Sequence, residues 1–428
     1  MTNRIFKVSF TVVLLLIMFS GLVHSQTVIS SPYSRYGLGK LQNSNQAYTM
    51  SMGGVGYGIR NSSIINFSNP ASYNCADTLS FVFETGVYSN FSVMKTKELS
   101  QNRNYTSLSY LLFGFPVTKW WGVGLGVLPY SNVGYKISDE QTIANVGRTD
   151  FTYEGSGGLN KVFIGNSFKP FKNFSIGFNA SYVFGALVKT RTVNFPDSVS
   201  FFNYKIKNNT NVGDFSFNYG LQYILPLKKG NSLNFGLVFS NSQKMGASKD
   251  ELGIRFLPQT GGGIIVKDTV AFTSDLSGDI VIPTSIGGGI VFKRTEKLLI
   301  GADVNWQNWS KYTSFGESDS LKNSMDFAFG GQFIPNSTSS SSYFKKMAYR
   351  LGVRYGQTYL QIKNSQLTEY AVSFGFTFPL RKTRTTVNLA FELGEMGTYE
   401  NNLHKEQFGR VMLTFNIKER WFIKPKFD

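Results

Sequence analysis

The sequence predicts an all-β fold, namely an antiparallel transmembrane β-barrel of about fourteen strands with an N-terminal plug, or hatch, in its lumen. Three observations lead to this prediction. Large apolar side chains alternate with small or polar ones along many segments after residue 78, for example from Val387 to Leu393. The extended segments are even in number, and short turns interleave with longer connections. The one long apolar run of the sequence lies within its first 25 residues.

The composition excludes several other classes of protein. Of the 428 residues, 42% are hydrophobic, 15% are aromatic and only 16% are charged, which is not the composition of a disordered chain. A single cysteine, Cys75, rules out a disulfide scaffold. After residue 25 no apolar run approaches the roughly 20 residues of a membrane-spanning helix.

Residues 1–25 have the features of a cleaved signal peptide. Arg4 and Lys7 precede an apolar stretch over residues 8–23, and the segment ending at Ser25 offers small residues where signal peptidase cleaves. The apolar stretch is short and polar residues follow it at once, which argues against a membrane anchor. The sequence therefore predicts export, and a location in the outer membrane of a Gram-negative bacterium.

Residues 26–78 do not follow the alternating pattern. They contain the runs Met50–Gly56, Asn61–Ser63 and Asn69–Ser72, which are rich in small residues and in residues that favour turns. The region is too long for a simple tail and too irregular for a strand. Because it precedes the first strand, we expect it to fold back into the lumen as the plug.

Residues 79–428 form the predicted barrel. Clusters of Gly, Pro, Asn and charged residues divide this region into extended segments. The segments lie near 79–90, 105–116, 120–136, 149–168, 174–192, 210–226, 232–246, 281–292, 298–311, 323–334, 344–359, 367–379, 385–398 and 406–418. Most of them exceed the roughly 9 to 11 residues that a tilted strand needs to cross a bilayer, so we expect several strands to project into the outer space.

The connections between these segments are of two kinds. Short basic turns such as 169–172 and 293–297 interleave with longer, polar segments, of which 247–280 is the longest. Short turns at one rim and long outer loops at the other are typical of outer-membrane barrels. The barrel is expected to close, because a bilayer offers no water to a free sheet edge.

Several polar side chains point into the lumen if the apolar face of each strand meets lipid. Those singled out are Asp303, Asn305, Arg350, Arg354 and Glu392. Opposite charges among them are expected to pair in so enclosed a space. Such a polar interior suits packing against a plug, or a wet channel, better than a long apolar tunnel.

The sequence offers little for catalysis or metal binding. After residue 25 the single histidine, His404, lies in a predicted outer loop without a nucleophile motif, and no Cys or His pair has the spacing of metal ligands. We therefore expect no enzymatic activity, no metal and no cofactor. The formal charge of +17 is spread over turns and loops, which favours contact with anionic lipid head groups or lipopolysaccharide over nucleic acid.

Short motifs along the chain resemble those of one protein family. Met-Gly-Gly at 52–54 followed by Asn-Pro-Ala at 69–71 resembles the N-terminal hatch of the FadL family of outer-membrane transport proteins for hydrophobic compounds. Later segments at 282–285, 303–312 and 349–355 fit the same pattern, so the resemblance spans nearly the whole chain after residue 25. The hatch residues that it implies are Gly53, Gly54, Asn69, Pro70 and Ala71.

The resemblance also implies a path for a ligand. In this family a hydrophobic ligand enters among the outer loops, moves into the barrel above the hatch and leaves sideways at a kink in the third strand. The third predicted strand contains Pro129 and Tyr130, and a proline cannot donate a hydrogen bond to a neighbouring strand. Pro129 therefore marks a lateral gap, or else simply ends the strand at the outer rim.

Two functions remain open at this point. The leading hypothesis is passive uptake of small, fatty-acid-like hydrophobic molecules with lateral release. The alternative is a structural or accessory barrel subunit, bound to other outer-membrane proteins in a larger export or assembly complex, which the polar lumen and the long outer segments favour. Uptake of labelled fatty acids and co-purification of partner proteins distinguish the two hypotheses. An open porin is disfavoured by the predicted hatch.

Overall fold

The computed structural model describes residues 31–42, 46–198, 201–259, 261, 263–336, 342–381 and 383–420. The predicted signal peptide at 1–25 lies outside these residues. Among the residues described, no helix combines the length and the apolar character that crossing a membrane requires.

The described residues confirm the predicted barrel of fourteen antiparallel strands. In chain order the barrel strands are β2 (Ser80–Lys95), β3 (Ser100–Pro116), β4 (Trp121–Ile143), β5 (Gly147–Phe171), β6 (Phe174–Asn194), β7 (Asn203–Pro226), β8 (Asn231–Ser240), β11 (Ser285–Arg294), β12 (Leu298–Gln307), β14 (Ser324–Phe333), β15 (Ala348–Ile362), β16 (Ser365–Pro379), β17 (Thr386–Gly397) and β18 (Lys405–Arg420). The ring closes where β18 pairs with β2, from Arg420 opposite Ser80 to Lys405 opposite Lys95.

Each barrel strand alternates between a lipid face and a lumen face, as β17 illustrates. Leu393 is 61% exposed on the outside of the barrel, whereas Glu392 is 2% exposed and Ala390 is fully buried on the inside. Successive side chains of a strand point to opposite faces of the sheet. The period-two pattern of the sequence thus sends large apolar side chains outward to lipid and encloses polar and small ones.

Four neighbouring strands are longer than a bilayer requires. β4, β5, β6 and β7 span 21 to 25 residues, against roughly 9 to 11 residues for a tilted crossing. On β7 the exposed apolar and aromatic side chains run from Phe215 to Leu225. The part of β7 from Asn203 to Val212 therefore lies beyond the bilayer, as the segment lengths predict.

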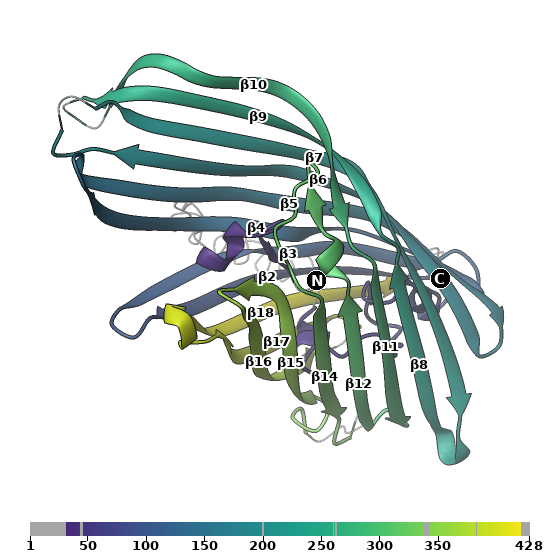
Figure 1. Ribbon diagram of the computed structural model, residues 1–428. Coiled ribbons are helices and arrows are strands. Elements are labelled where there is room, and N and C mark those ends of the chain that lie inside the picture. The colour runs from purple at the N-terminus through teal and green to yellow at the C-terminus, as the bar shows by residue number, and fades with distance from the viewer. Residues whose placement is uncertain are drawn as a thin grey trace, which may run out of the picture.

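Two further strands enlarge this projecting part. β9 (Gln243–Pro258) pairs with the outer half of β7, and β10 (Ile264–Ile282) pairs with β9. The outer halves of β4 to β7 together with β9 and β10 are called the outer sheet below. Figure 1 shows them projecting together away from the closed barrel. The short strand β13 (Thr313–Ser314) pairs with the base of β10.

The segment 247–280, expected to be a long outer loop, is instead mostly the β9–β10 hairpin. Three register shifts interrupt β10, the first between Val266 and Asp268. Each shift inserts residues that turn the following side chains to the other face, so no period-two pattern survives in the sequence. The single strand predicted over 232–246 was also wrong, because β8 ends at Ser240 and β9 begins at Gln243.

The N-terminal segment, residues 31–42 and 46–75, packs against the lumen face of the barrel. It contains η1 (Pro32–Arg35), β1 (Lys40–Leu41), α2 (Ala47–Met50) and η2 (Pro70–Cys75). The Gly53 amide donates to Ser373 Oγ at 2.8 Å, and a Cβ atom added to Gly352 would lie 2.1 Å from the Met52 carbonyl carbon. Glycine in the wall therefore allows direct contact between the two backbones.

We expect Gly352→Val to displace the N-terminal segment, because the new side chain would occupy the position of the Met52 backbone. Limited proteolysis of the folded protein should cut within residues 46–75 faster than in the parent. Gly288→Val is the matched control, since the nearest atom to its added Cβ, Gly236 O, is 4.0 Å away. Equal protease resistance in both variants would contradict the prediction.

Candidate lumen cavity and lateral opening

The barrel wall separates between β3 and β4. These strands pair only from Leu111 opposite Val127 to Pro116 opposite Gly122. Pro129 lies just beyond the last pair, and a register shift against β5 falls between Pro129 and Ser131. β4 nevertheless continues to Ile143, so Pro129 lies inside the strand and does not end it.

The N-terminal segment covers the edge of β4 that this separation leaves. In β1, Lys40 and Leu41 pair with Asn132 and Ser131, and the Gln42 amide donates to the Tyr130 carbonyl oxygen at 3.0 Å. Farther out, η1 continues this cover, since the Ser31 amide donates to Gly134 O at 3.0 Å and the Gly134 amide donates to Ser34 Oγ at 3.1 Å. The peptide groups of β4 next to the opening are therefore satisfied from within the chain.

A cavity of about 990 Å³ lies between the N-terminal segment and the wall. It reaches the opening, because residues 107–111 of β3 and 127–133 of β4 line it. Predicted residues that line it are Gly53, Gly54, Pro70, Pro129, Tyr130, Asp303, Asn305, Arg354 and Glu392. The lining combines aromatic and aliphatic side chains with amides and charges, so the cavity has a mixed polar and apolar surface.

Two of the predicted hatch residues, Asn69 and Ala71, are held against the wall by hydrogen bonds. Asn69 Nδ2 donates to the carbonyl oxygens of Tyr57 and Leu221 at 2.9 and 3.1 Å, and Asn69 Oδ1 accepts from the Ala71 amide at 3.0 Å. The Ala71 carbonyl accepts from Ser167 Oγ at 2.9 Å. These contacts place Asn69 and Ala71 against β5 and β7, whereas Pro129 lies on β4.

The predicted lumen charges divide into two kinds. Asp303 accepts the backbone amides of Gly56 and Tyr57 at 2.6 and 2.8 Å, so it fixes the N-terminal segment. Arg350 donates to Gln332 Oε1 at 2.9 Å and lies 4.0 Å from the ring centroid of Tyr48. The expectation that Asp303 and Arg350 pair with opposite charges was wrong, because backbone and aromatic groups of the N-terminal segment take that place.

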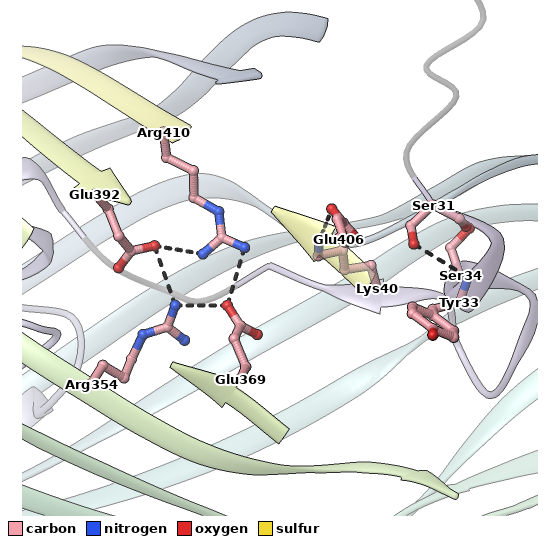
Figure 2. A network of polar contacts seen from close by, with 9 residues as sticks. All are labelled: Ser31, Tyr33, Ser34, Lys40, Arg354, Glu369, Glu392, Glu406 and Arg410. Atoms are coloured by element: carbon pink, nitrogen blue, oxygen red, sulfur yellow. Dashed lines mark hydrogen bonds and ion pairs between the residues drawn. The ribbon is translucent and has the colours of Figure 1, made fainter. Parts of the chain in front are cut away.

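Arg354 and Glu392 belong to a cluster of four charges, shown in Figure 2. Arg354 contacts Glu369 at 2.8 Å and Glu392 at 3.2 Å, and Arg410 contacts the same two carboxylates at 3.2 and 2.6 Å. The alternating charges balance in a space that excludes most water. Sequence reasoning missed Glu369 and Arg410, although they share the strand parity of the inward-facing Ala371 and Met412.

The outer end of the N-terminal segment is fixed to the last outer connection. The rings of Tyr33 and His404 stack with centroids 4.0 Å apart, and the Tyr33 hydroxyl donates to the His404 carbonyl oxygen at 2.5 Å. Beside them Lys40 pairs with Glu406 at 3.0 Å. Burial lowers the pKa of the His404 side chain, because loss of hydration disfavours its charged form.

No group of His, Cys, Asp and Glu side chains within the described residues has the arrangement of a metal site. The four-charge cluster is neutralised within itself, and Asp303 accepts two backbone amides. The cavity thus lies between the N-terminal segment and the wall, and it reaches the separation of β3 and β4.

Comparison with known proteins gives a family and a fold. A family model described as BamG matches residues 4–428. Among solved structures, the toluene transporter TodX of Pseudomonas putida is 15% identical, with a TM-score of 0.56 over 88% of this chain and 98% of TodX. The toluene transporter TbuX of Ralstonia pickettii is 12% identical, with a TM-score of 0.56 over 93% of this chain and 100% of TbuX.

A FadL homologue of Pseudomonas aeruginosa is also similar, at 12% identity and a TM-score of 0.55 over 88% of this chain and 98% of that protein. These structural similarities confirm the fold that the sequence motifs implied. At such low sequence identity, structural similarity shows a shared fold and nothing further. The search of curated proteins found no match. The chain is thus a bacterial outer-membrane barrel of FadL type.

We expect Glu392→Leu to lower the free energy of unfolding by about 3–5 kcal/mol, because it leaves two buried guanidinium groups with one carboxylate. Urea unfolding in detergent, followed by tryptophan fluorescence, measures this loss. The control is Glu296→Leu, which removes an exposed partner of Lys293 and should cost less than about 1 kcal/mol. Equal losses of unfolding free energy in the two variants would show that the buried cluster stabilises the fold no more than an exposed ion pair does.

Proposed function

The chain belongs to the BamG family, and from that premise we propose that it acts as a barrel subunit of a larger outer-membrane protein assembly. The observation that carries this proposal is the outer sheet. β9 pairs with the part of β7 that lies beyond the bilayer and β10 pairs with β9, so their apolar side chains face water and not lipid. On β10, Val270, Phe272 and Leu276 are 46%, 73% and 49% exposed. Apolar surface of this kind outside the membrane is typical of a protein contact.

The lumen supports the same proposal. We propose that the N-terminal segment acts as the hatch, which its contacts with Asp303, Ser373 and Arg350 of the wall support. Charged side chains such as Glu392 and Arg410 also lie inside the lumen. A barrel closed in this way works as a scaffold. Its short-turn rim supplies contacts for anionic lipid head groups through basic turns such as 228–229 and 293–297.

We expect tagged protein, extracted from its native membrane in mild detergent, to retain at least one other outer-membrane protein in constant ratio. Replacing residues 248–277 by a short turn should abolish this retention, because it removes the exposed surface of the β9–β10 hairpin. The barrel should still close, since β8 pairs directly with β11 along its whole length. Heat-modifiable migration on a gel checks that closure. A parent protein that elutes alone, or a shortened variant that keeps its partner, would overturn the proposal.

A second candidate function is passive uptake of a small hydrophobic, fatty-acid-like molecule with lateral release. The cavity that reaches the opening beside Pro129 favours it. Lys161 on β5 also lines this cavity, and its Nζ lies 5.8 Å from the ring centroid of Tyr130. No carboxylate of the described chain forms an ion pair with Lys161, so this ammonium group is free to bind the carboxylate of a ligand.

For this second function we expect a deletion strain to take up less labelled fatty acid than the parent strain. Lys161→Gln should reduce uptake of the acid and leave uptake of toluene unchanged, because only the acid carries a charge. Lys172→Gln, at an exposed turn, is the control. Unchanged fatty-acid uptake in the deletion strain would exclude this function.

A further inference from the structure

The outer half of β3 is a free strand edge. From Ser100 to Leu108 this strand pairs with β2 alone, without a register shift. On its other side β4 pairs only from Leu111 onward, and within the described residues no other strand pairs there. Figure 1 shows the β2–β3 hairpin and the outer sheet diverging from each other. The backbone N–H and C=O groups on that side of β3 therefore have no partner strand.

Within the part of the chain that the structure describes, the edges of β4 and β10 near the outer space are protected, and this contrast sets β3 apart. The edge of β4 is covered by β1 and η1, as described above. The edge of β10 carries three register shifts as well as Lys267 and Asp268, and bulges and charges of this kind block pairing with another chain. Between Ser100 and Leu108, β3 has no bulge, no proline and a single charged residue, Arg103.

The lower end of this edge lies at the depth of the bilayer. Leu108 is 57% exposed and pairs with Val87, and exposed Phe91 lies farther out on β2. A bilayer cannot satisfy unpaired peptide groups, and strand edges at this depth are tolerated only beside a water-filled cavity or another polypeptide. Tyr105, Ser107 and Leu108 also line the cavity, so the edge is accessible from both the lumen and the outer space.

We propose that this free edge accepts an extended segment of a partner protein as an added β-strand. The inference rests on the proposed function as a subunit of an assembly and names one contact of that subunit. The chain itself contains a precedent, because β1 pairs with the opposite edge of the same opening through Lys40 and Leu41. Strand addition binds through main-chain hydrogen bonds, and side chains supply its specificity.

The side chains of the edge indicate the character of the partner segment. Residues 100–107 read Ser-Gln-Asn-Arg-Asn-Tyr-Thr-Ser, which are polar apart from one tyrosine ring. A polar strand fits beside them better than an apolar one, since cross-strand neighbours pair by type. An acidic residue in the segment would complement Arg103, the one cation of this run.

A photo-reactive amino acid placed at Asn102 or Thr106 tests the contact in the intact membrane. Both positions are exposed, and we expect illumination to yield one adduct of defined mass with another outer-membrane protein. Asn211, exposed on the paired strand β7, is the control and should give no such adduct. An adduct with lipid only, with a second copy of this chain, or with no protein while the co-purified assembly stays intact would overturn the inference. Loss of the assembly itself would instead count against the proposed function.

Proline variants provide a second test. Backbone amides of an antiparallel strand point alternately to its two sides, so only one of Asn102→Pro and Arg103→Pro removes an amide from the free edge. That variant should keep heat-modifiable migration but reduce the adduct at Thr106 at least about fivefold. The other should weaken the β2–β3 pairing. If the correctly folded proline variant retained the full adduct, the edge would not be the binding surface.

Discussion

The hydrocarbon core of a membrane offers no hydrogen-bond partner to a peptide group, and the rest of this structure depends on that constraint. It requires β18 to pair with β2, because any open seam at that depth would leave a row of unsatisfied groups. Wherever the wall separates, the exposed peptide groups also need other hydrogen-bond partners. Between β3 and β4 the chain supplies partners for one of the two edges, because β1 and η1 cover the edge of β4.

Closure of the barrel determines which side chains the lumen encloses and which of their charges need partners. With large apolar side chains directed to lipid, the polar half of each strand is enclosed, and enclosed charges need partners. Arg354, Arg410 and the two glutamates opposite them balance one another, whereas Asp303 is balanced by amides of the N-terminal segment. The same inward-facing side chains thus line the cavity and bind the N-terminal segment. The polarity of the lumen therefore reflects its contacts with this segment as much as any ligand.

The parts that were predictable from sequence are those that depend on local pattern. Alternation located the fourteen barrel strands and placed residues such as Arg354 and Glu392 on the inner face. It failed over 247–280, because the bulges of β10 destroy the period-two pattern. Pro129 indicated a break in the pairing of its strand. The sequence did not predict which neighbouring strand separates from β4, because this depends on pairing between distant segments. The partners of Asp303 and Arg350 were missed for the same reason, since the irregular segment 46–75 has no periodicity that would orient it.

The position of β18 beside β2 has a consequence for biogenesis. The first and last barrel strands form the joint, so the cylinder cannot be completed until the whole chain has been synthesised. The N-terminal segment contacts strands on opposite sides of that cylinder, since α2 packs on β16 to β18 and η2 packs on β3 to β7. Sealing the joint between β2 and β18 therefore encloses a segment of the same chain. A chain whose N-terminal segment is misplaced would leave inward-facing charges such as Asp303 without their partners in the closed wall.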